Sequence, residues 1–314
     1  MSPAFRFWAL ALGAGLLSGA FYLAVAYRPF ASMPLLYFAQ FPLFVAGLAG
    51  GATASLVAGI AAGSLVMTHE FGIALSLLFG AVFIVPVPIL VRQALLARTG
   101  SLGGVEWYPP GLLTGWLVGI GLALLGLGSV VIGLQGGIEA YARQSAGFTV
   151  DLLGQMIQQP PSPGERARAV DRLSAHLLGA AVAVVMVVTV INATLAQGLL
   201  MRFGWNRRPA PDMAALDLPP HVPLLALGCL AAGMLLPGDL GYVLRNALPV
   251  LLAGGLLAGL AVAHAAMRRL NGRSWMLALL YMVAIFMGLP MFLLMAIGMA
   301  EPFLKLKRRM LAAA

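Results

Sequence analysis

Long apolar stretches separated by short polar ones make up most of the chain. An α-helix needs about 20 apolar residues to cross a hydrocarbon core about 30 Å thick, and most of these stretches approach that length. The pattern therefore predicts membrane-spanning helices; the second and seventh stretches are short and fit tilted, re-entrant or internally packed segments. The predicted segments cover residues 7–27, 33–48, 50–67, 71–91, 110–134, 177–201, 222–237, 243–267 and 275–300.

Two longer polar regions interrupt this pattern. In the first, apolar side chains recur among polar ones over residues 137–158, which favours a helix lying in the membrane interface. A proline-rich run ends that helix, and a second one begins near Glu165. The whole insert, 135–175, is interpreted either as a solvated connector on the headgroups or as a lid over an outward-facing cavity. The second region, 205–223, contains five prolines and predicts an extended strap.

The composition supports a membrane protein. Hydrophobic residues make up 61% of the chain and charged residues 9%, and the mean hydropathy is +0.96. These values exclude a water-soluble globule, a disordered chain and a disulfide scaffold. The predicted fold class is therefore all-α, a polytopic helical bundle with eight or nine transmembrane segments. Its parts are a first membrane bundle (1–134), an extracytoplasmic amphipathic insert (135–175) and a second membrane bundle (176–314).

The excess of basic residues predicts the orientation of the bundle. The chain has 19 Lys and Arg against 10 Asp and Glu, which cationic cytoplasmic loops explain better than nucleic-acid binding. With residues 7–27 as an uncleaved first span and the amino terminus cytoplasmic, the inner loops are basic and the outer loops balanced. Nine full spans would place the basic tail around Lys307 outside. We expect 222–237 not to cross, which returns that tail to the cytoplasm and leaves eight spans.

Small residues at four-residue spacing lie on one face of several predicted helices. Ala11, Gly15 and Gly19 form such a stripe in the first span. Stripes of this kind let helix backbones approach closely, either within one chain or between subunits. The stripe of the first span is the better candidate for docking a partner subunit, because a terminal helix need not be enclosed by others.

The polar residues deep within the predicted spans are neutral, and Tyr37, Gln40 and Asn192 are the main ones. Gln40 lies beside Pro42, whose missing amide hydrogen leaves a backbone carbonyl free and favours a small polar pocket. The three residues either bond across helix interfaces or line a cavity for a neutral substrate. No charged residue lies deep in a span, which argues against a proton-relay pump.

Signatures of catalysis and of cofactor binding are absent from the sequence. The chain has no GxxxxGK[ST] phosphate loop and no HExxH, CxxC or GxSxG motif. Its one cysteine, Cys229, lies in an apolar stretch, so neither an internal disulfide nor a metal site is expected. We therefore expect no enzyme and no cofactor. A lipid-handling enzyme that uses Glu139 and Asp151 of the insert and the adjacent His176 is a third, less favoured reading.

The carboxyl-terminal residues suggest a family. The run Gly298-Met299-Ala300-Glu301-Pro302-Phe303-Leu304-Lys305-Leu306-Lys307-Arg308-Arg309 resembles the end of the YybS-like bacterial membrane proteins, domain of unknown function 2232. Glu301 matches the acidic position and Phe303 the aromatic position of that family's closing pattern. The segment Leu216-Asp217-Leu218-Pro219 is similar to the proline-preceded helix of the same family. This resemblance implies a multi-pass protein of the bacterial inner membrane.

The early helices are also similar to the substrate-binding S components of energy-coupling-factor transporters. The similarity lies in residues 42–65, where a proline-containing helix precedes a Gly/Ala-rich one. It implies a binding or transport subunit that docks on a transmembrane coupling subunit and takes energy from separate ATPases. The alternative is a membrane scaffold or regulator that recruits cytoplasmic partners through the proline-rich region 205–223, here called the inner linker, and through the basic tail. Membrane lipids are expected partners in both cases, and nucleic acid is not.

Overall fold

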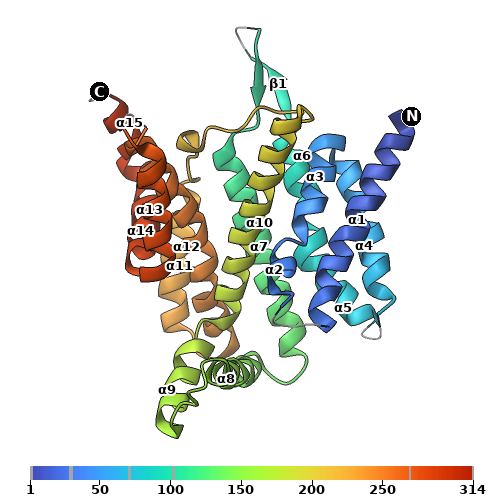
Figure 1. Cartoon of the computed structure of the whole chain (residues 1–314). Helices are drawn as coiled ribbons and strands as arrows, with labels where there is room; N and C mark the ends of the chain where they lie inside the picture. The colour runs from blue at the N-terminus through green and yellow to red at the C-terminus, as the bar shows by residue number, and fades with distance from the viewer. Residues whose placement is uncertain (1–2, 28–30, 70–71, 101–102, 269, 313–314) are drawn as a thin grey trace. The chain divides into compact units, whose positions relative to one another are not determined.

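The computed structural model describes residues 3–27, 31–69, 72–100, 103–268 and 270–312, and nearly all of the regular structure in these ranges is helical (Figure 1). The all-α prediction is confirmed, apart from two three-residue strands that pair antiparallel between the fourth and fifth predicted segments. The elements are α1 (Pro3–Tyr27), α2 (Met33–Tyr37), α3 (Gln40–Gly50), α4 (Ala52–Met67), α5 (Gly72–Phe79), η1 (Gly80–Ile84), α6 (Pro86–Ala94), β1 (Ala97–Thr99), β2 (Val105–Trp107), α7 (Pro110–Gly133), α8 (Ile138–Met156), α9 (Pro163–Ser174), α10 (Leu177–Phe203), η2 (Met213–Ala215), α11 (His221–Leu235), α12 (Gly238–Ala266), α13 (Arg273–Met287), α14 (Leu289–Leu304) and α15 (Leu306–Ala312).

Each predicted apolar segment corresponds to helix, but the predicted count of eight or nine spans is not confirmed. Within the described ranges, six helical stretches are long and apolar enough to cross a membrane. Two shorter apolar helices, α4 and α11, fall below that length. The last predicted span, 275–300, is broken: α13 and α14 meet at Gly288 with a bend of 111°, and counting this pair as one span raises the total to seven.

The chain forms two compact units. The first comprises 1–117 and 187–215, and the second 118–186 and 216–314. The core of the first unit lies where α1, α3, α4 and α6 meet the second half of α10. Its fully buried side chains include Leu43, Phe44, Val66 and Phe79.

Glycine contacts bring α12 and α14 together in the second unit. A Cβ atom added to Gly298 would lie only 1.8 Å from the carbonyl oxygen of Gly255, and one added to Gly259 would lie 1.9 Å from that of Leu294. Such close backbone packing requires residues without side chains, as in other membrane helix pairs. In the most apolar 18-residue stretch of α12, 61% of the residues are buried, so α12 is the central helix of this unit.

The insert between α7 and α10 folds as a helical hairpin, α8–α9. The proline-rich run separates the two helices as predicted, and Ser162 and Glu165 form a capping box at the start of α9. Tyr242 of α12 donates a hydrogen bond to the carbonyl oxygen of Ser174, 2.6 Å away. This bond ties the end of α9 to the beginning of α12.

Candidate functional site

Pro42 breaks the second predicted span into α2 and α3. A proline nitrogen carries no hydrogen, so Pro42 cannot donate to the carbonyl of Phe38 one turn earlier. The amide of Phe41 donates to Phe38 instead, at 3.0 Å and with three-residue spacing. This tighter turn leaves the carbonyl of Tyr37 at the carboxyl end of α2 for a partner from outside the helix.

Asn192 of α10 supplies that partner. Its side-chain Nδ2 donates to the Tyr37 carbonyl at 2.7 Å and to the carbonyl of Val188 in its own helix at 2.8 Å. Asn192 is 1% exposed. Tyr37 takes part through its backbone, and its side chain is largely exposed. The carboxamide thus stabilises the helix break from a position 155 residues away in the sequence.

A second irregular backbone segment, η1, lies in contact with α3. At η1 the helix widens to a π turn, in which the amide of Val85 donates to the carbonyl of Gly80 at 2.9 Å. Pro86 follows directly and has no amide hydrogen to donate to Val82, four residues before it. The side-chain Nε2 of Gln40 donates to the Val82 carbonyl at 3.2 Å. One-turn π segments of this kind frequently occur at functional sites.

The carboxamides of Gln40 and Asn192 use their nitrogens in hydrogen bonds, and their oxygens stay available as acceptors. Within the part of the chain that the structure describes, Gln40 Oε1 and Asn192 Oδ1 are buried and accept no hydrogen bond. Asn246 of α12 shows the ordinary structural arrangement: its Oδ1 accepts from the Gly179 amide, and its Nδ2 donates to Ala175 and Tyr242. Because buried acceptors are usually paired, the oxygens of Gln40 and Asn192 mark a site that can receive donors.

Helix α1 contacts both the helix break and the aromatic residues around η1. Tyr22 of α1 lies 4.5 Å from Phe79 and 5.5 Å from Phe83, measured between ring centroids. Ser18, also on α1, donates to the carbonyl of Ala39 at 2.6 Å. The helix break is therefore tied to α1 through Ser18, and the oxygens of Gln40 and Asn192 are the acceptors that it offers to a donor.

The structure brings the three predicted site residues to one helix break, but not with the predicted pairing. The sequence suggests that Pro42 frees a carbonyl beside Gln40; Gln40 instead binds the carbonyl left by Pro86, and Asn192 binds the one left at Tyr37. Sequence reasoning missed Ser18 and Val82. The spacing of Pro86 and Pro88 inside an apolar run was a usable signal for Val82, whereas nothing marks Ser18.

The predicted docking stripe of α1 faces α4 within the same unit. A Cβ atom on Gly15 would lie 2.2 Å from the carbonyl oxygen of Ala58, and one on Gly19 would lie 2.9 Å from that of Ala62. Ala11 is fully buried. This arrangement is the intramolecular packing that the spacing also allowed. Helix α4 covers the stripe, so this face is not available to a partner subunit in the structure.

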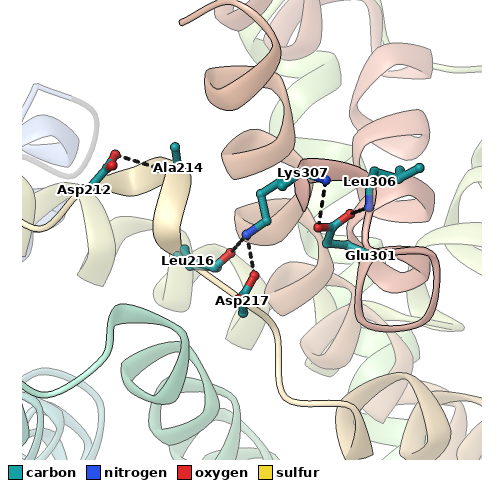
Figure 2. Close-up of polar contacts among 7 residues, drawn as sticks. All are labelled: Asp212, Ala214, Leu216, Asp217, Glu301, Leu306 and Lys307. Carbon is teal, nitrogen blue, oxygen red and sulfur yellow. Dashed lines mark hydrogen bonds and ion pairs between the residues drawn. The ribbon is translucent and has the colours of Figure 1, made fainter. Parts of the chain in front are cut away.

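The basic tail and the inner linker, which the scaffold hypothesis uses, bind each other in the second unit. The ammonium of Lys307 donates to the carbonyl of Leu216 at 2.5 Å and to the carboxylate of Asp217 at 2.6 Å (Figure 2). The carboxylate of Glu301 accepts from the amides of Leu306 and Lys307 at the start of α15. Lys307 and Glu301 are both buried. We call these contacts the tail clasp.

Arg208 anchors the other end of the linker in the first unit. Its guanidinium donates to the carbonyls of Ala94 and Tyr108, at 2.8 and 2.9 Å, and lies over the ring of Trp107. Burial lowers the pKa of this guanidinium from its ordinary value. The carbonyl of Arg208 accepts from Gln197 and Asn206. Hydrogen bonds from Arg208 to backbone carbonyls thus hold the first part of the linker at the end of α6 and next to the start of α7.

The carboxylates of the hairpin, which the third reading uses, are engaged in ion pairs. Glu139 contacts Arg143, and Asp151 contacts Arg166. Among the described residues, no three His, Cys, Asp or Glu side chains gather as metal ligands would.

No family model, no curated protein and no solved structure matches the chain.

Proposed function

We propose that this protein is a membrane-embedded binding or transport subunit for a small neutral molecule, similar in role to an S component. The observation that carries the proposal is the pair of buried, unpartnered carboxamide oxygens at the α2–α3 break. Discontinuous helices are a common way to build binding sites at membrane depth, because the free backbone groups and their side-chain partners are covered by protein. Energy for transport would come from partner proteins.

The chemistry of the site favours an uncharged ligand that carries N–H or O–H groups. Gln40 Oε1 and Asn192 Oδ1 can only accept hydrogen bonds, so they select donors and disfavour anions. Residues 1–69, which supply α1 to α4, contain no Asp or Glu to balance a cation. The rings of Tyr22, Phe79 and Phe83 pack against one another in the core of the same unit and supply apolar surroundings.

Native mass spectrometry tests this function. The protein is released gently from its own membrane, and the small molecules that travel with it are identified. We expect a bound molecule in the wild type. Gln40→Leu keeps the size of the side chain but removes the acceptor, so affinity for that molecule should fall about two- to tenfold, the value of one hydrogen bond.

Gln197→Leu is the matched control. It removes another buried carboxamide from the same unit, but one whose partner, the carbonyl of Arg208, also accepts from Asn206. This variant should retain the ligand. A wild-type protein without any bound small molecule, or equal ligand loss in the two variants, contradicts the proposal.

A membrane scaffold is the second candidate, and the tail clasp favours it. The clasp joins the linker to the tail and leaves Lys305, Arg308 and Arg309 of the tail exposed beside it as a basic surface. In the same mass-spectrometry experiment, a chain that carries cytoplasmic proteins but no small molecule would support the scaffold.

We also propose eight crossings, with the amino terminus and the tail in the cytoplasm. The tail clasp supports this count, because it requires the linker and the tail to lie on one side of the membrane and hence an even number of crossings between them. If α11 and α12 both cross, the sharply bent α13–α14 pair enters and leaves on the same side. This re-entrant pair replaces 222–237 as the segment that does not cross.

A further inference from the structure

The helix α8 lies across the ends of the helices in its unit. Figure 1 shows α8 almost end-on, whereas α12 runs along the page. The inner side of α8 packs against the start of α12, where Ile138 and Ala142 form a small core with Tyr242. A helix perpendicular to the spans runs parallel to the membrane plane.

Short connections hold α8 and α9 at the membrane boundary. Only residues 134–137 separate α8 from the end of α7, and only 175–176 separate α9 from the start of α10. A chain advances at most about 3.6 Å per residue, so neither end of the hairpin can move far from a spanning helix. Lipid is therefore the nearest large surface outside the protein.

Beyond its contact with α12, α8 carries an apolar ridge formed by three exposed side chains, Tyr141, Phe148 and Met156. These side chains are 44%, 69% and 59% exposed. They are spaced seven and eight residues apart, close to two helical turns, so they share one face. Large exposed apolar side chains on one face of a helix mark an interaction site on a membrane or a protein.

Ion pairs make the hairpin a single body and neutralise its charge. Arg166 binds both carboxylate oxygens of Asp151 at 2.7 Å, and Arg143 of α8 binds Asp171 of α9 at 3.1 Å. The hydrogen bond from Arg166 holds the pKa of Asp151 below its ordinary value. Residues 135–175 contain four arginines and four carboxylates, so the hairpin has no net charge to attract anionic lipid.

We propose that the apolar ridge of α8 is buried in the phospholipid bilayer, at the boundary between headgroups and acyl chains, while α9 remains in water. Membrane contact of an interfacial helix scales with its buried apolar area and with its charge, and only the first of these is available here. The contact is therefore independent of the headgroup charge and of the salt concentration.

Depth-dependent quenching tests this proposal on the full chain. Single-cysteine variants are made in a Cys229→Ser background, labelled with an environment-sensitive fluorophore and placed in phosphatidylcholine nanodiscs with or without brominated acyl chains. Phe148→Cys and Met156→Cys report on the ridge. Ala167→Cys, at an exposed position of α9, is the matched control. We expect brominated lipid to remove most of the fluorescence at 148 and 156 and to leave that at 167 unchanged.

The same labels distinguish an electrostatic contact. Addition of phosphatidylglycerol, or of high salt, should leave the quenching at 148 and 156 as it was. Two results overturn the proposal: ridge labels that are quenched no more than the label at 167, or quenching that requires anionic lipid and disappears at high salt.

Discussion

At the scale of single residues, a comparison of three buried carboxamides shows how a structural residue differs from a candidate site residue. Asn246 uses its oxygen and its nitrogen to hold the beginning of α10 against α12. Gln40 and Asn192 use only their nitrogens, and each donates to a carbonyl left without a helical partner near a proline; Asn192 also donates to Val188. The side-chain type is the same in each case, and what differs is whether the oxygen is satisfied.

The bonding of Asn246 predicts a cost for its removal. Asn246→Ala leaves the amide of Gly179 buried without an acceptor, and such a group costs about 1–3 kcal/mol. We expect the free energy of unfolding, measured in mixed micelles, to fall by about that amount. Asn206→Ala should change it little, since the carbonyl that Asn206 binds keeps Gln197. Equal losses in the two variants would contradict this assignment.

At the scale of elements, close backbone contacts decide which helix faces are closed. The stripe of α1 packs on α4, and Gly255 and Gly259 of α12 pack on Gly298 and Leu294 of α14. The sequence spacing indicates that these faces pack, but the same spacing fits a partner subunit.

Two glycines of α1, two residues apart, test the α1–α4 contact. Gly15→Ala places a methyl group 2.2 Å from the carbonyl oxygen of Ala58, whereas nothing lies within 4 Å of a Cβ atom on Gly13. Overpacking of this kind costs about 1–3 kcal/mol. We expect Gly15→Ala to lower the melting temperature of the purified chain and Gly13→Ala to leave it unchanged or raise it slightly. A Gly15→Ala chain that melts as the wild type does would show that α1 is not closed against α4.

At the scale of the whole molecule, the tail clasp constrains the path of the chain through the membrane. In the proposed topology the linker and the tail share a side, and we expect the α8–α9 hairpin on the opposite side because α10 is long and apolar enough to cross. That topology would place the basic residues of the linker and those of the tail on the same side of the membrane, as the positive-inside rule requires.

Labelling in intact cells tests this path. In the Cys229→Ser background, a membrane-impermeant maleimide should label Ala167→Cys on the hairpin. Ala215→Cys in the linker and Arg309→Cys in the tail should react only after the membrane is opened. Labelling of 309 without 215 would show an odd number of crossings between them, and labelling of both without 167 would reverse the orientation.

The sequence by itself determined the all-helical membrane class, the hairpin between α7 and α10, and the neutral polar residues of the candidate site. These features follow from local composition and helical period, which a single stretch of chain carries. Only the tertiary structure decided that Gln40 binds Val82, 42 residues away, that Asn192 binds Tyr37, and that Lys307 closes on the linker. It also broke the last predicted span at Gly288, a bend that apolar composition does not encode. Which carbonyl a carboxamide reaches depends on how distant helices pack, and the packing of distant helices is the information that local periodicity lacks.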